Sequence, residues 1–85
     1  MKTVWKYTLS PVSYLMIPKG SKVLFVDNQK EIAQLWALVD PSQEKESREF
    51  VVYGTGHDVP DNPGNYVGSF LMSSGSLVFH VFEQT

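Results

Sequence analysis

Apolar and polar residues alternate along most of this chain, and almost no stretch repeats its apolar residues at the spacing of a helix. The first segment shows the pattern, because Trp5, Tyr7 and Leu9 share one face while the residues between them share the other. Side chains alternate sides along a β-strand, whereas one face of a helix needs a period of about 3.6 residues. The alternation therefore predicts half-buried strands and an all-β fold.

Turn-forming residues separate the apolar runs from one another. Pro18-Lys19-Gly20 and Ser73-Ser74-Gly75 contain residues that tight turns favour, and Gln29-Lys30-Glu31 is short enough to join an antiparallel hairpin. Residues 40–47 and 55–65 are predicted to be loops. Strands are expected near residues 2–9, 14–17, 23–28, 32–40, 48–54, 66–72 and 76–83. Residues 1–85 are thus predicted to form one domain, a small antiparallel barrel or a two-layer sandwich of six to seven short strands.

Two of the expected strands, residues 32–39 and 77–82, are apolar on both faces. In the first, Ile32, Trp36 and Leu38 lie opposite Ala33, Leu35, Ala37 and Val39; in the second, Leu77, Phe79 and Val81 lie opposite Val78, His80 and Phe82. Burial on both faces requires a second layer behind each face. A helix-free chain of 85 residues can hardly build three layers, so we expect another copy of the chain to supply the missing one. The alternative is a closed barrel whose outer face exposes some apolar residues.

The absence of cysteine also favours self-association. A domain of 85 residues buries only about 60–65% of the surface of its unfolded chain, and small domains often depend on disulfides, metals or partner subunits. Without cysteine the chain has no disulfide and no thiolate zinc site, and it contains only two histidines. A homo-oligomer with no metal and no cofactor is therefore expected.

No segment predicts a membrane span or an export signal. The longest apolar runs, residues 23–26 and 35–39, are far shorter than the roughly 20 residues that a membrane helix requires. Residues 1–7 contain two lysines and no small-residue cleavage site. A cytoplasmic protein is the expectation.

Charge is divided unevenly along the chain, although the net charge is only −2. Residues 1–26 carry four lysines and no acid, a charge of +4, while residues 27–85 carry three basic and nine acidic residues, a charge of −6. This asymmetry indicates an anion-binding side. Four lysines neutralise too few phosphates for long duplex DNA but suit a small anion with roughly one to three phosphates. The alternative is that they are solvated lysines, which discourage aggregation at an edge strand.

The segment from Tyr53 to Tyr66 is rich in glycine, proline and Asx residues. It contains Gly54-Thr55-Gly56, whose successive backbone N–H groups could form a nest for an anion. His57 could donate to a phosphate, and the two tyrosines could stack on a base. The alternative is a rigid connection whose glycines serve turns, because no helix follows them as phosphate-binding fingerprints require.

Catalytic groups are sparse in this sequence. His57-Asp58 could pair as a base and its orienting group, but no nucleophile motif accompanies them. The spacing of His57, Asp58 and Asp61 matches no metal-ligand pattern. His80 alternates within an apolar strand, which favours a core or interface histidine with a hydrogen-bond partner. We expect a protein that is not an enzyme.

Six segments together resemble a family of small proteins encoded by bacteriophages and prophages. They are Trp5-Lys6-Tyr7 and the segments IPKG at 17–20, LWALVDP at 35–41, YGTGH at 53–57, NYVGSF at 65–70 and LVFHVFE at 77–83. The resemblance implies a phage accessory protein that acts in the cytoplasm of the bacterial host. It implies no catalytic residue.

The leading hypothesis is an oligomeric, non-catalytic sponge that sequesters a small phosphorylated host immune signal of the cyclic-nucleotide or ADP-ribose type. The residues predicted to bind it are Trp5, Lys6, Lys19, Lys22, Tyr53, Gly54, Thr55, Gly56, His57 and Tyr66. The lysines would supply charge, the aromatic residues would stack on a base, and the glycine segment with its histidine would donate hydrogen bonds. The alternative is an inhibitor that binds and blocks a host protein directly, through exposed aromatic residues and the acidic surface.

Overall fold

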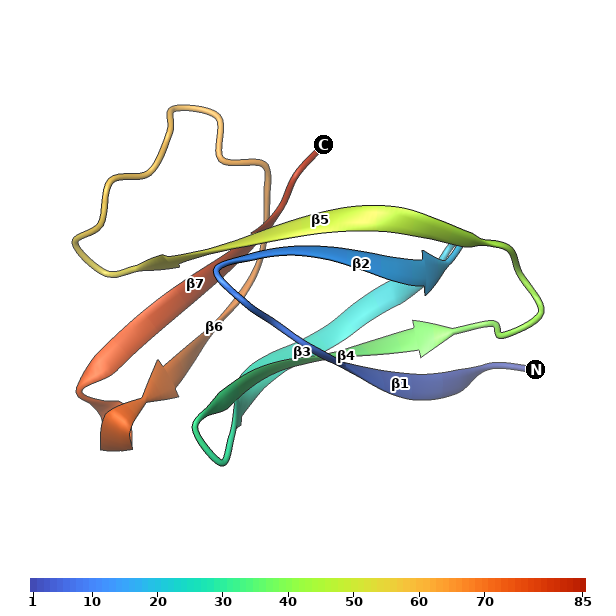
Figure 1. The fold of residues 1–85 in the computed structure, drawn as a ribbon, viewed down its shortest axis with the longest axis horizontal. Helices are drawn as coiled ribbons and strands as arrows, with labels where there is room; N and C mark the ends of the chain where they lie inside the picture. Colours follow the sequence, from blue (N-terminus) through green and yellow to red (C-terminus); the bar gives the residue numbers. More distant parts are fainter.

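Seven strands form two antiparallel sheets in the computed structural model, which describes residues 1–85 (Figure 1). The strands are β1 (Thr3–Thr8), β2 (Val12–Pro18), β3 (Lys22–Gln29), β4 (Ile32–Val39), β5 (Lys45–Gly54), β6 (Asn65–Met72) and β7 (Leu77–Glu83), with one 3₁₀ turn, η1 (Ser73–Gly75). The three-stranded sheet has the order β1-β4-β3 and the four-stranded sheet the order β2-β5-β7-β6. The all-β prediction is confirmed, and the two open sheets make the fold a sandwich rather than a closed barrel.

The strand boundaries follow the alternation closely, except in β2 and β5. β2 begins at Val12 rather than at Tyr14, and it includes Pro18, which was expected in the turn. The predicted loop at residues 40–47 is wrong for its last part, because β5 already begins at Lys45. Residues 45–47 pair with residues 16–18 of β2. Their backbone hydrogen bonds make them strand residues, although their polar side chains are typical of turns. The structure has no helix with the length and hydropathy that crossing a membrane requires.

One core lies between the two sheets. Its members come from alternate positions of both sheets, as the alternation predicts for half-buried strands. The largest side chains with no exposed surface include Ile17, Leu35, Val39, Phe50 and Val81. The edge strands β3 and β6 also lie against each other, although no backbone ladder joins them. The two sheets are therefore held together by side chains.

The chain covers only one face of β4 and of β7. Leu35 and Val81 are fully buried on the inner faces, but Ile32 on the outer face of β4 is 50% exposed. Trp36 and Phe82, also on outer faces, keep part of their surface exposed. A two-layer sandwich cannot cover these outer faces, so the additional layer expected from the sequence is not supplied by the chain itself.

The turn between β3 and β4 is tied to the opposite sheet. Its two central residues, Lys30 and Glu31, have φ values of 55° and 63°, the left-handed conformation that asparagine and glycine usually adopt in such hairpins. The Glu31 N–H donates to Asn28 Oδ1 at 2.6 Å, and Asn28 Nδ2 donates to the Leu71 carbonyl at 3.1 Å. The Ser73 N–H donates to Glu31 Oε2 at 3.2 Å. These bonds stabilise the turn and join it to the β6–β7 turn.

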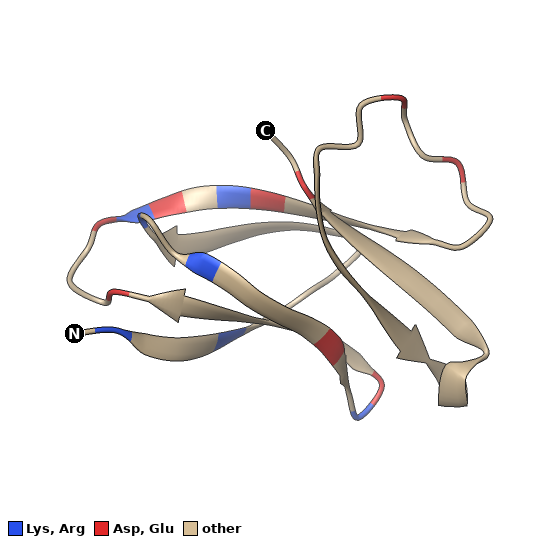
Figure 2. Ribbon diagram, turned by 180° about the vertical axis from the view of Figure 1, so that it is seen from behind, with Lys and Arg blue, Asp and Glu red and all other residues tan.

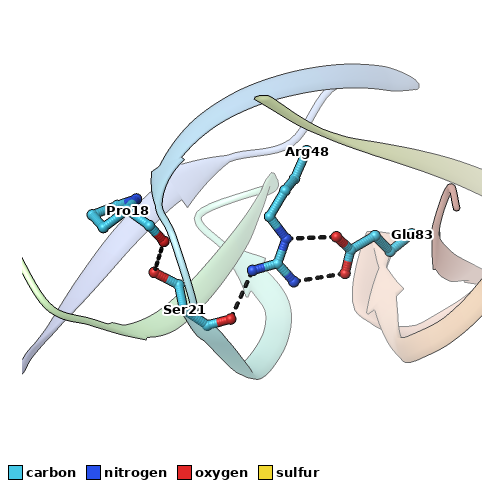
Figure 3. Close-up of polar contacts among 4 residues, drawn as sticks. All are labelled: Pro18, Ser21, Arg48 and Glu83. Carbon is cyan, nitrogen blue, oxygen red and sulfur yellow. Dashed lines mark hydrogen bonds and ion pairs between the residues drawn. The ribbon is translucent and has the colours of Figure 1, made fainter. Parts of the chain in front are cut away.

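Arg48 joins three separate parts of the chain (Figure 3). Its guanidinium donates two hydrogen bonds to the Glu83 carboxylate, at 2.5 and 2.7 Å, and one to the Ser21 carbonyl at 2.7 Å. The Ser21 hydroxyl in turn donates to the Pro18 carbonyl at 2.6 Å. The hydrogen bonds to Glu83 raise the pKa of Arg48 above its ordinary value. The ion pair thus connects β5 with β7, and the hydrogen bond to Ser21 connects the same side chain with the β2–β3 turn.

Tyr7 has a buried hydroxyl without a hydrogen-bond partner, which leads to a stability prediction. An unpartnered buried polar group costs about 1–3 kcal/mol, so Tyr7→Phe is expected to raise the free energy of unfolding by about 1 kcal/mol. Urea unfolding near neutral pH measures this. Tyr14→Phe is the matched control, because Tyr14 is 68% exposed and its replacement should change little. A destabilised Tyr7→Phe protein would show that the hydroxyl has a partner in solution.

The same residue predicts a dependence on alkaline pH. Burial raises the pKa of Tyr7 above its ordinary value of 10.0. The unfolded chain releases the proton first, so ionisation of this group leaves the stability of the fold unchanged below pH 10.0 and lowers it as the pH rises from there through the pKa of the folded state. Unfolding curves over this range should show a smaller loss of stability for Tyr7→Phe than for the unchanged protein. Equal losses in the two proteins would show that ionisation of Tyr7 does not cause the loss of stability.

Candidate functional site

Lysines and aromatic residues meet on the outer face of the three-stranded sheet. Lys6 on β1 and Phe25 on β3 both pair with Trp36, which lies between them on β4. In the next row, Val4 and Lys22 pair with Leu38 in the same way. We call this surface, formed by Val4, Lys6, Lys22, Phe25, Trp36 and Leu38, the basic-aromatic face. It faces outward because the alternate residues of β4 are the ones buried in the core.

The aromatic pair of this face can receive a planar ring. The Phe25 and Trp36 ring centroids lie 5.6 Å apart with an interplanar angle of 43°, and Phe25 is 56% exposed. Lys6 Nζ donates to Gln29 Oε1 at 2.8 Å, which holds the ammonium group over the sheet. The Asp27 carboxylate accepts the Asn28 N–H at 2.7 Å in the neighbouring row. Aromatic surfaces with nearby ammonium groups suit a flat ring that carries negative charge.

Two of the predicted site residues from the basic segment lie away from this face. Trp5 turns toward the core side of β1, and Lys45 Nζ lies 6.0 Å from its ring centroid. Lys19 lies in the β2–β3 turn and forms an exposed ion pair with Glu44 at 3.4 Å. The sequence predicts Lys6, Lys22, Trp5 and Lys19 as one group, whereas the structure places only Lys6 and Lys22 on the basic-aromatic face.

The lysines of the basic segment and the glycine-rich loop lie toward different ends of the molecule (Figure 2). Figure 2 shows basic positions gathered toward the end that carries the N-terminus, with a further one at the β3–β4 turn. The loop between β5 and β6 extends from the opposite end, and its only charged positions are acidic (Figure 2). The ten predicted residues therefore do not form one site within a single chain.

The glycine segment is occupied by its own hydrogen bonds. The Gly54 N–H donates to His57 Nδ1 at 3.2 Å, the Thr55 N–H to the Val78 carbonyl at 3.0 Å, and the His57 N–H to the Gly54 carbonyl at 3.0 Å. A Cβ atom at Gly54 would lie 2.8 Å from the His57 ring, and Gly56 has a φ of 88°. Both glycines therefore have local structural roles. The successive free N–H groups expected of an anion nest are not present, which corrects this part of the prediction.

His57 and Gly54 instead line a cavity of about 430 Å³ at one end of the sandwich. Its other walls are largely apolar and include Leu9, Ile32 and Phe79. Since Nδ1 of His57 accepts a hydrogen bond, the neutral ring carries its proton on Nε2. An apolar cavity of this kind offers little stabilisation to a phosphate.

Tyr53 and Tyr66 lie on the outer face of the four-stranded sheet, on either side of Phe82. Their ring centroids lie 5.8 and 5.6 Å from that of Phe82, both in edge-to-face arrangements. Tyr66 also lines a polar cleft of about 390 Å³ between the two sheets, together with Lys22 and Arg48. This cleft is the one place where a predicted tyrosine and a predicted lysine lie together.

His80 has hydrogen-bond partners on both ring nitrogens, as its sequence environment predicts. Nδ1 lies 2.8 Å from Ser69 Oγ, and Nε2 lies 2.8 Å from Thr55 Oγ1. Both partners are hydroxyl groups, which can donate or accept, and Thr55 Oγ1 also lies 3.3 Å from the Val78 carbonyl oxygen. In a Ser-His-Asp triad a carboxylate orients the catalytic histidine. No carboxylate takes part in the bonds around His80.

The chain matches, over residues 1–85, a family model described as a domain of unknown function, DUF7352. The protein belongs to the DUF7352 family. No curated protein and no solved structure matches the chain. The site is therefore interpreted from its own residues. No group of three or more His, Cys, Asp or Glu side chains lies close enough together to hold a metal ion.

Sequence reasoning missed Phe25 and Trp36 as site residues. Trp36 could have been found, because the two-faced pattern of residues 32–39 already places it opposite the core. Phe25 could not have been found in this way. It shares a face with Lys22 only because the register shifts between Val23 and Phe25, and alternation alone would place the two on opposite faces.

Proposed function

We propose that this DUF7352 protein is a non-catalytic binding protein that captures a small phosphorylated molecule with a planar ring, of the nucleotide class, on its basic-aromatic face. One observation carries the proposal. Lys6, Trp36 and Phe25 form a single row across three strands, with Lys22 in the next row. The row supplies an aromatic surface for the ring and ammonium groups for phosphate.

The energies expected of these contacts suit a small ligand. Stacking of a base on an aromatic side chain contributes about 1–3 kcal/mol, and charge-assisted hydrogen bonds contribute about twice as much as neutral ones. Two lysines on one face match the charge of about one or two phosphates. The nearby Asp27 carboxylate would oppose a longer polyanion.

The resemblance to phage proteins supports a more specific form of this proposal. The ligand would be a cyclic-nucleotide or ADP-ribose-type immune signal of the bacterial host, which the protein would sequester in the cytoplasm. Sequestration needs no turnover, so the absence of a catalytic motif in the sequence is compatible with it. A sponge releases its bound ligand chemically unchanged, whereas an enzyme would convert it.

Isothermal titration calorimetry against cyclic di- and trinucleotides and cyclic ADP-ribose isomers tests the proposal. A Trp5→Phe background leaves Trp36 as the single tryptophan, because the chain contains two. Ligand binding is expected to change the fluorescence of Trp36, and Trp36→Leu should weaken binding by about 10-fold to 100-fold. Chromatography of the released ligand should return it intact.

The lysines provide a matched comparison. Lys6→Gln with Lys22→Gln should weaken binding by about 10-fold or more and reduce its dependence on salt. Lys19→Gln is the control, because Lys19 already pairs with Glu44 outside the face. The proposal fails if no member of the panel binds, or if Lys19→Gln weakens binding as much as the double variant does.

A further inference from the structure

We propose that the outer face of the four-stranded sheet is a self-association interface, on which a second copy of the chain supplies the missing layer. This surface, the outer aromatic face, lies on the other sheet from the basic-aromatic face, so the inference does not rest on the proposed function. Its residues are Val12, Tyr14 and Met16 on β2, Glu49, Val51 and Tyr53 on β5, Val78, His80 and Phe82 on β7, and Tyr66, Ser69 and Leu71 on β6.

The exposed area of this face is large enough for a stable dimer. Tyr14 is 68% exposed, Tyr66 61%, Met16 and Leu71 54% each, and Val12 49%. Large side chains present about 150–250 Å² when fully exposed, so these residues and their half-buried neighbours expose on the order of 800 Å². A standard protein interface buries about 800 Å² on each partner. Large contiguous apolar surfaces of this kind are uncommon on monomers.

The distribution of charge selects this face rather than the other. A two-fold axis brings the same residues of both copies together, and on the basic-aromatic face it would bring Lys6 and Lys22 near their own copies. Like charges in an interface are unfavourable. The residues of the outer aromatic face include no Lys or Arg, and their one acid, Glu49, lies in the row of Tyr14. Lys45 lies farther along the same side of β5, but its Nζ lies 6.0 Å from the ring centroid of Trp5 on the other sheet. A second copy is therefore better tolerated on the outer aromatic face.

Three polar side chains of this face, Tyr66, Ser69 and His80, already have partners within the chain. Tyr66 Oη lies 2.7 Å from Ser69 Oγ, Ser69 bonds to His80, and His80 bonds to Thr55. Covering such groups with a second copy costs little, because none of these bonds to the protein must be broken. The edge-to-face packing of Phe82 with both neighbouring tyrosines also holds these rings in place before association.

Analytical ultracentrifugation over a range of protein concentrations tests the inference. The unchanged protein should sediment as a species of twice the 9.6 kDa chain mass. Tyr14→Lys and Leu71→Lys should each raise the dissociation constant of the dimer by about 100-fold, because each substitution buries an unpaired charge at the two-fold interface. Val4→Lys is the matched control, since Val4 is 48% exposed on the basic-aromatic face, and its dimer should be unchanged. Circular dichroism confirms that each variant is folded.

Cross-linking locates the contact without relying on disruptive charges. The chain contains no cysteine, so single Tyr14→Cys, Leu71→Cys and Val4→Cys variants each present one thiol. A short bismaleimide should join the Tyr14→Cys or Leu71→Cys chains into dimers and leave the Val4→Cys chains as monomers. The inference is overturned if the unchanged protein is monomeric at all concentrations, if Val4→Cys cross-links instead, or if purified protein holds a different protein on this face.

Discussion

Gly64→Ala is expected to lower the free energy of unfolding by about 4 kcal/mol. A Cβ atom at this position would lie 2.3 Å from the carbonyl oxygen of Glu83 and 3.0 Å from its carbonyl carbon. Both are backbone atoms of β7, so neither can move as a flexible side chain would. The backbone around Gly64 is also held in place, because Gln84 Nε2 donates to the Pro63 carbonyl at 2.8 Å. The substitution must therefore displace the start of β6 from the end of β7.

Gly56→Ala separates this clash from backbone strain. Gly64 has a φ of 98° and Gly56 a φ of 88°, so alanine is strained to a similar degree at both positions. A Cβ atom at Gly56 would have no heavy atom within 4 Å. Gly56→Ala should therefore cost only about 1 kcal/mol. Urea unfolding of the two variants measures the difference, and equal effects would contradict the steric argument.

Arg48→Met is expected to destabilise the fold by about 3 kcal/mol, the second-largest effect. Removing one partner of a buried ion pair costs about 3–5 kcal/mol, because the other charge is left unpaired. The lower value applies here, since the Arg48 and Glu83 side chains are 18% and 21% exposed. The Ser21 carbonyl also loses its donor. The loss reflects a charge without a partner more than the strength of the pair.

Two further variants test that interpretation of the ion pair. Arg48→Met combined with Glu83→Gln removes the unpaired charge and should recover part of the lost stability. Lys19→Met breaks an ion pair whose side chains are 55% and 84% exposed, and it should cost less than about 0.5 kcal/mol. If Arg48→Met proves as mild as Lys19→Met in chemical unfolding, the Arg48–Glu83 pair does not stabilise the fold in solution.

The sequence predicts the strands well because alternation is a local property. Residues two apart lie on the same face whatever the strand pairs with, so Trp5, Tyr7 and Leu9 could be placed together without knowing their neighbours. Short turns between strands predict hairpins for the same reason. The prediction failed locally at residues 45–47, where pairing with β2 outweighs the polar character of the side chains.

The site depends on long-range pairing and could be predicted only in part. Lys6 and Lys22 come together because β1 and β3 both pair with β4, an arrangement that no local pattern specifies. The sequence also suggested that Trp5 and Lys19 would join them, but one faces the core and the other pairs with Glu44. Distance along the chain was a poor guide to distance in space.

The irregularity in β3 absorbs one residue without changing the basic-aromatic face. Leu24 has no partner on β4, whereas Lys22 pairs with Leu38 and Phe25 pairs with Trp36. Loss of Leu24 would leave these same partners opposite one another in a regular strand, with Lys22 and Phe25 two positions apart on one face. Related chains that lack this residue would therefore present the same charge beside the same aromatic pair. Divergence of ligand preference in such proteins would then follow from substitutions on this face rather than from the loss of this residue.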